Sequence, residues 1–421
     1  MRLGSSFAIP SYLKTTAACL SLAAAAVLAA LFGLLWLPPF AGNLVALLGA
    51  AFALSAGAVA LGGLIVLIRA GRAARGRPDI FLELNRSRDP AAVIAGDVAH
   101  MGRLRRWLGR CLLGHDLLVG DEVEIKTWAE IRATLDAHGC MEQLPFMPEM
   151  LALCGQRAHV FRCMHRLFDH RKSRRMRHMD GAVLLVGAVC DGAHHGGCEA
   201  ACHTIWKAAW LRRVVPGRST PQQSAQPDAV GRMDGTEVLR FGTTGPRYTC
   251  QLTQLSAASR PLGRLTASHF LLPLVSGNVT LGAFAVGWLT HLFNEVQQKR
   301  HGVGFPAFEP AQDADRSGEP RLEAGAEVVV QSAGEIRATL NDQLMHRGLW
   351  LEPDMLKHCG QQHRIRAEVR VLIDIVSGEM ITMKTPAYAL AGVHFSGERQ
   401  LFNAQYEPLF WRAVWLRSVK K

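Results

Sequence analysis

The feature that most constrains this chain is a long apolar run, from Thr15 to Ile68, without any Asp, Glu, Lys, Arg or His. It is interrupted once, by a Pro- and Gly-containing stretch at 38–43. A helix needs about 20 apolar residues to cross a bilayer core, where its backbone groups must bond internally. Thr15–Leu37 and Leu44–Ile68 both reach this length. The pattern predicts an α-helical transmembrane hairpin over residues 1–68.

Basic residues follow the second arm of this hairpin, and the formal net charge of the chain is +12. They include Arg69, Arg72, Arg75 and Arg77, and then Arg103, Arg105, Arg106 and Arg110. Lys and Arg next to a membrane segment mark its cytoplasmic side. The first apolar run is also too long for a cleaved signal peptide. We therefore expect an inner-membrane protein whose ends and later domains face the cytoplasm.

Residues 69–116 form a basic juxtamembrane segment in this interpretation. Leu104, Trp107 and Leu108 interleave with the arginines at helical spacing, as in a helix that lies on a membrane surface. The Arg69–Arg110 region would then contact the bilayer through anionic lipid headgroups. A solvated linker helix is the alternative. The position beside the membrane favours lipid over nucleic acid.

The later part of the chain contains an internal repeat. Glu130–Leu135 (Glu-Ile-Arg-Ala-Thr-Leu) recurs letter for letter at Glu335–Leu340, an offset of 205 positions. The same offset relates Cys154 to Cys359 and the segment Trp206–Val214 to Trp411–Val419. A constant offset over a whole module indicates duplication. We expect two copies of one domain, at 117–214 and 321–421.

Each copy shows the patterns of a small, mostly β domain. Val123 and Ile125 alternate with charged residues, as in a half-buried strand, and Val328 and Val330 repeat this. Thr127 and Ser332 stand three residues before a Glu, which predicts a capping box and a short helix. Strands near 158–167 and 182–189 and Gly-containing turns complete the order. This order resembles SH3-like barrels, so each copy is expected to form a small β-barrel or roll.

Residues 215–320 separate the two copies. Pro216–Gly235 has the composition of a flexible linker, and Tyr248–Cys250 has strand-like character. His269–Phe293 is nearly free of charge, but its continuous apolar half, Leu281–Phe293, is too short to span a bilayer. We expect a buried or membrane-surface helix that ends at Lys299-Arg300.

The first copy contains a run of cysteines and histidines suited to a metal. Thiolates and imidazoles are the usual zinc ligands, and thiolates also hold iron–sulfur clusters. Cys198 and Cys202 are one helical turn apart, and the glycines nearby permit tight folding around an ion. The candidate ligands are Cys190, Cys198, Cys202, Cys250, His194, His195 and His203.

The second copy has Phe395, Asn403 and Glu407 where the first has Cys190, Cys198 and Cys202. The fold therefore does not require these thiols, and any role for them belongs to the first copy. Zinc is the preferred cofactor and an iron–sulfur cluster the alternative. Buried thiols without a metal remain a third interpretation.

No nucleotide-binding, zinc-protease or serine-hydrolase motif occurs in the sequence. Cys154 and Cys359 occur in both copies, which favours packing over a duplicated nucleophile. We expect a membrane-anchored cytoplasmic binding or scaffold protein with a zinc site in its first β module and an unidentified protein or small-molecule partner. A thiol or iron–sulfur redox enzyme at the inner membrane face is the alternative. Nucleic-acid binding through the basic residues Arg171–Arg177 is a weaker third hypothesis.

Overall fold

The alternating Glu122–Ile125 segment forms strand β1, with Val123 and Ile125 buried as expected. The computed structural model describes residues 106–107, 109–111, 117–169, 175–215, 239, 246–262, 267–279, 281–301, 320–395, 397, 400 and 402–419. These residues all belong to one compact unit of the chain, Arg77–Lys421.

The first copy is built on a five-stranded antiparallel sheet in the order β8-β7-β4-β1-β9. The other strands of this sheet are β4 (Arg157–Cys163), β7 (Ala182–Val189), β8 (His203–Lys207) and β9 (Leu211–Arg213). Helix α6 (Trp128–Arg132), the hairpin β2–β3 (Cys140–Met141 and Leu144–Pro145) and the 3₁₀ helix η1 (Pro148–Leu153) connect β1 to β4. A second 3₁₀ helix, η2 (Ala208–Trp210), precedes β9.

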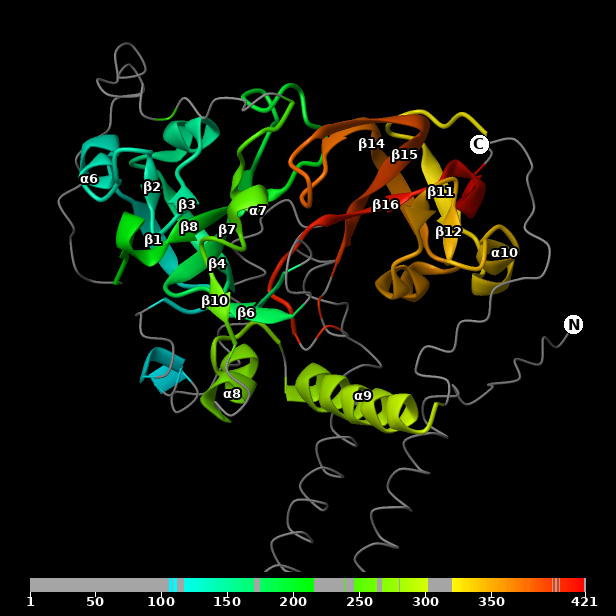
Figure 1. Ribbon diagram of the computed structural model, residues 1–421, viewed down its shortest axis with the longest axis horizontal. Helices are drawn as coiled ribbons and strands as arrows, with labels where there is room; N and C mark the ends of the chain where they lie inside the picture. The colour runs from blue at the N-terminus through cyan, green and yellow to red at the C-terminus, as the bar shows by residue number, and fades with distance from the viewer. Residues whose placement is uncertain are drawn as a thin grey trace, which may run out of the picture. The chain divides into compact units, whose positions relative to one another are not determined.

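The second copy repeats this arrangement, with the strand order β16-β15-β14-β11-β17 (Figure 1). Its strands are β11 (Glu327–Val330), β14 (Gln362–Ile373), β15 (Met380–His394), β16 (Pro408–Trp411) and β17 (Leu416–Ser418). The connecting elements are α10 (Ala333–Ala338), β12 (Met345–His346), β13 (Leu349–Trp350), η5 (Pro353–His358) and η6 (Ala413–Trp415).

Both predicted capping boxes are confirmed: the side chains of Thr127 and Ser332 accept from the backbone N–H groups of Glu130 and Glu335. The repeated hexapeptide also has a packing role. The indole N–H of Trp210 donates to Thr134 Oγ1 at 3.0 Å, and that of Trp415 donates to Thr339 Oγ1 at 2.8 Å. All four of these groups lie in or beside the two cores, where an unpaired indole N–H would cost free energy. In each copy, the Thr of the hexapeptide and this Trp therefore form the same pair, which holds the helix against the core.

The expected fold class needs correction in two respects. The described pairings in each sheet end at β8 and β9, or at β16 and β17, so the sheets are open half-barrels rather than closed barrels. Strands β9 and β17 have three residues each, and they pair along that length with β1 and β11. The described part of the chain is mostly antiparallel β sheet with few helices.

The predicted membrane anchor is the second correction. Among the helices that the structure describes, none combines the length and the apolar character needed to cross a bilayer. The two arms predicted for the hairpin, Thr15–Leu37 and Leu44–Ile68, lie outside the described residues. The transmembrane hairpin and the inner-membrane localisation inferred from it are therefore not supported by the fold. In addition, Arg106 and Arg110 of the basic segment pair with the buried carboxylate of Asp121, at 2.5 and 3.4 Å.

The region between the copies also differs in part from expectation. The apolar stretch forms two helices, α8 (Ala267–Val275) and α9 (Leu281–Lys299), and α9 ends where predicted. Between them, Asn278 accepts from the Cys163 amide and donates to its carbonyl, both at 2.8 Å. The strand predicted at Tyr248–Cys250 was wrong: these residues form no strand, and Cys250 directly precedes the short helix α7 (Gln251–Gln254). Strand β10 (Arg260–Pro261) of this region pairs with β6 (Met176–His178) of the first copy, and β6 pairs with β5 (Leu167–Phe168), so the three form a small sheet.

The loops before β8 and β16 are closed by matching backbone hydrogen bonds, and each loop is exchanged in the sense that it contacts the other copy. The amide of Cys190 donates to Cys202 O, and that of Phe395 donates to Glu407 O, at 2.8 and 2.9 Å. From these loops the amide of Glu199 donates to Val371 O of the second copy, and that of Ala404 donates to Arg166 O of the first. The two contacts are equivalent, because Glu199 corresponds to Ala404 and Arg166 to Val371 at the repeat offset of 205 positions. The two copies thus meet through a reciprocal interface, like that of a twofold dimer.

Candidate metal site

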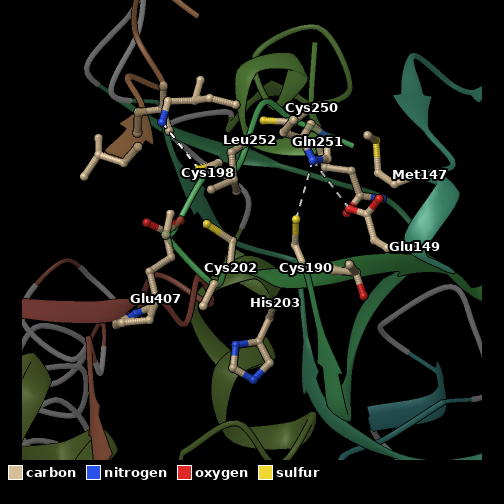
Figure 2. A pocket seen from close by; sticks show the side chains of 18 of the residues that line it. Met147, Glu149, Cys190, Cys198, Cys202, His203, Cys250, Gln251, Leu252 and Glu407 are labelled. Atoms are coloured by element: carbon tan, nitrogen blue, oxygen red, sulfur yellow. Dashed lines mark hydrogen bonds and ion pairs between the residues drawn. The ribbon is translucent and has the colours of Figure 1, made fainter. Parts of the chain in front are cut away.

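A cavity of about 200 Å³ lies where the exchanged loop of the first copy meets the second copy (Figure 2). Its lining includes all four of the cysteines proposed as ligands, Cys190, Cys198, Cys202 and Cys250. The second copy supplies apolar and acidic wall residues, among them Leu372, Ile373 and Glu407. The cavity therefore needs both copies, although its sulfur groups come from the first copy and from the segment between the two.

Three side chains from separate elements converge at one side of this cavity. Glu149 lies in η1, Cys190 directly follows β7, and His195 lies in the loop that leads to β8. Their ligand atoms all lie within 4.8 Å of one another. His195 Nδ1 is 3.7 Å from Cys190 Sγ and 3.9 Å from Glu149 Oε1. A thiol, an imidazole and a carboxylate are the three side-chain groups that bind zinc.

Local sequence explains how these groups reach the site. Pro148 starts the 3₁₀ helix and so turns Glu149 inward, where its side chain is only 7% exposed. Gly192 has a φ of +73°, and a Cβ there would lie 1.9 Å from Cys198 O. Only glycine fits this close approach of backbone to backbone. The resulting turn places the Gly192 amide 3.4 Å from Cys190 Sγ, to which it donates.

The polar atoms of this trio are buried without full hydrogen bonding. Both carboxylate oxygens of Glu149 and the Nε2 of His195 are enclosed and have no hydrogen-bond partner outside the trio. Burial lowers the pKa of His195, so the imidazole is neutral at pH 7. Burial, and then the charge of Glu149, raise the pKa of the Cys190 thiol. A cation would satisfy the carboxylate and reverse the cost of ionising the thiol.

The remaining predicted residues divide between the cavity and the surface. Cys198, Cys202 and Cys250 line the cavity, but their three sulfurs do not all lie within 4.8 Å of one another. His203 contributes to the lining, yet its ring points away from the sulfurs in Figure 2 and packs against Phe161. His194 is exposed and is not part of the lining.

Two acidic residues of the cavity, Glu149 and Glu407, were missed in the sequence. Glu149 had a detectable signal: the second copy places Asp354 at the same position, so a carboxylate recurs within an otherwise apolar segment. Glu407 had none, because its position matches Cys202 and only the folded interface brings it to the first copy's cavity. In the second copy, Phe395 and Gln400 replace Cys190 and His195, so the trio is not duplicated.

The duplicated cysteines do not have the environment of nucleophiles. Burial raises the pKa of the Cys154 thiol to about 12 and also raises that of Cys359. A reactive cysteine needs a lowered pKa, so both residues fit the packing interpretation. Of the basic segment proposed for nucleic acid, 171–174 lies outside the described residues, and Arg177 donates to Ser259 Oγ and Ser256 O.

Fold and cavity together define a duplicated, open β-sheet protein with a Glu/Cys/His group of metal-binding geometry in one of its two copies. The chain matches no protein-family model, no curated protein and no solved structure. Its function is therefore inferred from the cavity itself.

Glu407→Gln is expected to stabilise the metal-free protein at high pH, because Glu407 Oε1 is enclosed without a hydrogen-bond partner. Burial raises the pKa of Glu407 from 4.5 to about 7. The folded state therefore holds a proton that the unfolded state releases, and stability falls as pH rises from about 5 to 8. The variant should flatten this fall and gain about 2–3 kcal/mol at pH 8, since one pKa unit corresponds to about 1.4 kcal/mol.

Urea unfolding at pH 5 and pH 8 measures this effect. Glu323→Gln, which alters an exposed carboxyl of the second copy, is the matched control and should leave the pH dependence unchanged. An unaltered pH profile in Glu407→Gln would show that this carboxyl is solvated in solution.

Proposed function

We propose that this protein is a metal-binding protein whose first copy holds one zinc ion at Glu149, Cys190 and His195. The observation that supports this most strongly is the convergence of these three ligand types, within 4.8 Å, around polar atoms that lack other partners. Buried carboxylates and imidazoles are normally hydrogen-bonded, and a metal ion is the partner that this set of groups fits.

The ligand number favours an open site over a closed structural one. Structural zinc sites use four protein ligands, whereas three protein ligands leave a fourth position for water or a bound molecule. Here the fourth position would face the cavity, whose wall includes Leu252, Leu372 and Ile373. A small molecule with one metal-binding atom and an apolar body suits such a space. Binding of that kind of ligand is the function we infer.

The second copy then acts as a scaffold. It has a carboxylate, Asp354, at the matching position but no thiol or imidazole, and it supplies one wall of the first copy's cavity. This division explains why the duplicated sheets are alike while their loops differ in chemistry.

Metal analysis and chelator competition on the full chain test the proposal. The wild-type protein should bind a tight equivalent of zinc that Cys190→Ser, His195→Ala and Glu149→Gln each weaken by more than about 100-fold, because changes to groups behind a ligand already cost 10–100-fold. Cys154→Ser, at a half-buried cysteine outside the cavity, should retain zinc. Equal zinc affinity in all four variants would contradict the site. If the protein instead contained iron and showed visible charge-transfer absorption, the cofactor would be an iron–sulfur cluster and not zinc.

A further inference from the structure

Three cavity thiols are not used by the Glu149, Cys190 and His195 site. Cys198 lies in the exchanged loop, Cys202 comes just before β8, and Cys250 just before α7. Figure 2 shows their sulfurs around the same cavity, and all three line it. We propose that Cys198, Cys202 and Cys250 form a second metal site, selective for a large thiophilic divalent ion such as Cd²⁺.

The backbone around these sulfurs is arranged to support thiolates. The amide of Ile373, from the second copy, donates to Cys198 Sγ at 3.4 Å. Backbone amides at the start of α7, those of Leu252 and Thr253, interact with the sulfur of Cys250. A neutral thiol is a weak acceptor, whereas a thiolate gains substantially from N–H donors. Such donors are therefore most useful when the sulfur carries charge, as it does on a metal.

The charge balance of the cavity also suits a cation. Three thiolates and a divalent ion leave one net negative charge, which is costly in a half-enclosed space. The guanidinium of Arg366 lies near enough to Cys202 for the two charges to interact. Its positive charge would offset part of the negative charge that the thiolates and the neighbouring Glu407 contribute. Sulfur-only ligation selects soft metals over those that prefer oxygen or nitrogen.

The spacing of the sulfurs distinguishes this site from a preformed zinc site. Sulfurs that share one tetrahedral zinc ion are about 3.8 Å apart, given a Zn–S length near 2.3 Å. The three sulfurs here are more widely placed, since they do not all lie within 4.8 Å. A metal must therefore draw the side chains toward the centre of the cavity, and a larger ion requires smaller movements. This is a second reason to expect a thiophilic ion larger than zinc.

The site belongs to the first copy, and the fold does not depend on it. The matching loop of the second copy has the same hydrogen-bonded turn, with Asn403 and Glu407 in place of Cys198 and Cys202. A packing role would not require sulfur at these positions. Cys250 lies outside the repeat altogether, yet it reaches the same cavity.

Loading the full-length protein with ¹¹³Cd²⁺ and recording cadmium NMR tests this proposal. The wild-type protein should bind two equivalents and give two resonances. One should have the strongly downfield shift of a sulfur-only site, and the other the intermediate shift of mixed sulfur, nitrogen and oxygen ligation. Cys202→Ser and Cys250→Ala should each lose the downfield resonance and one equivalent of cadmium while keeping the other.

The reverse experiment separates this site from the proposed zinc site. Combined Glu149→Gln and His195→Ala should remove the intermediate resonance and keep the downfield one. If the double variant kept the intermediate resonance while the cysteine variants behaved as expected, the zinc site would be contradicted and the thiolate site would still be supported. A single equivalent of cadmium in the wild type, or loss of all cadmium from either set of variants, would overturn the second site. Cys359→Ser, at a half-buried cysteine of the second copy, should keep both resonances.

Discussion

Replacing Tyr406 by alanine is expected to lower the free energy of unfolding by about 3–5 kcal/mol, the range for large aromatic residues removed from a core. Tyr406 belongs to the second copy but packs in the core cluster of the first, where it is 4% exposed. Its ring stacks on His394 at 4.4 Å, meets Phe161 edge-on at 4.7 Å, and lies 4.7 Å below the Arg162 guanidinium. Alanine would leave a cavity at the junction of the two copies.

Chemical denaturation of the full chain measures this loss. Trp350→Ala is the matched control, because Trp350 is an aromatic residue of the second copy that is 43% exposed, and its loss should change stability by less than about 0.5 kcal/mol. If Tyr406→Ala were no more destabilising than Trp350→Ala, the exchanged loop would not be part of the first copy's core in solution.

Gly192→Ala is the second change with a large expected effect, and Gly397→Ala in the other copy should match it. A Cβ at either position would lie 1.9 Å from a carbonyl oxygen, that of Cys198 or of Asn403, and each glycine has a positive φ. The left-handed conformation costs a non-glycine residue about 1–2 kcal/mol, and forced overpacking adds about 1–3 kcal/mol. We expect a total loss of about 3 kcal/mol from each substitution.

Gly197→Ala separates these two contributions. Gly197 has a φ of +80°, but a Cβ there would meet nothing within 4 Å. This control should cost only the conformational part, about 1–2 kcal/mol. Equal losses for Gly192→Ala and Gly197→Ala would mean that the backbone contact in the turn is not formed. Since this turn also positions Cys190, zinc affinity should fall in Gly192→Ala and be unchanged in Gly397→Ala.

Local features of the fold were predictable because a few neighbouring residues determine them. Thr127 with Glu130, and Ser332 with Glu335, satisfy each other's backbone groups within one turn, so the helix starts could be located from spacing. The alternation at Val123 and Ile125 likewise follows from a sheet with one buried face. The membrane hairpin was inferred from hydropathy alone, and the described helices do not support it.

The duplicated β unit and the thiols of its first copy could be recognised without coordinates, because they follow from a constant offset and from residue identity. The folded chain was needed to show that Glu149 joins Cys190 and His195 and that Cys250 reaches the same cavity. It was also needed to show that Glu407 and Tyr406 contact the first copy. The two kinds of feature differ in the distance along the chain over which the responsible interactions act. Capping and alternation act over a few residues, whereas the cavity depends on strand pairing and loop exchange between segments that are far apart in the chain.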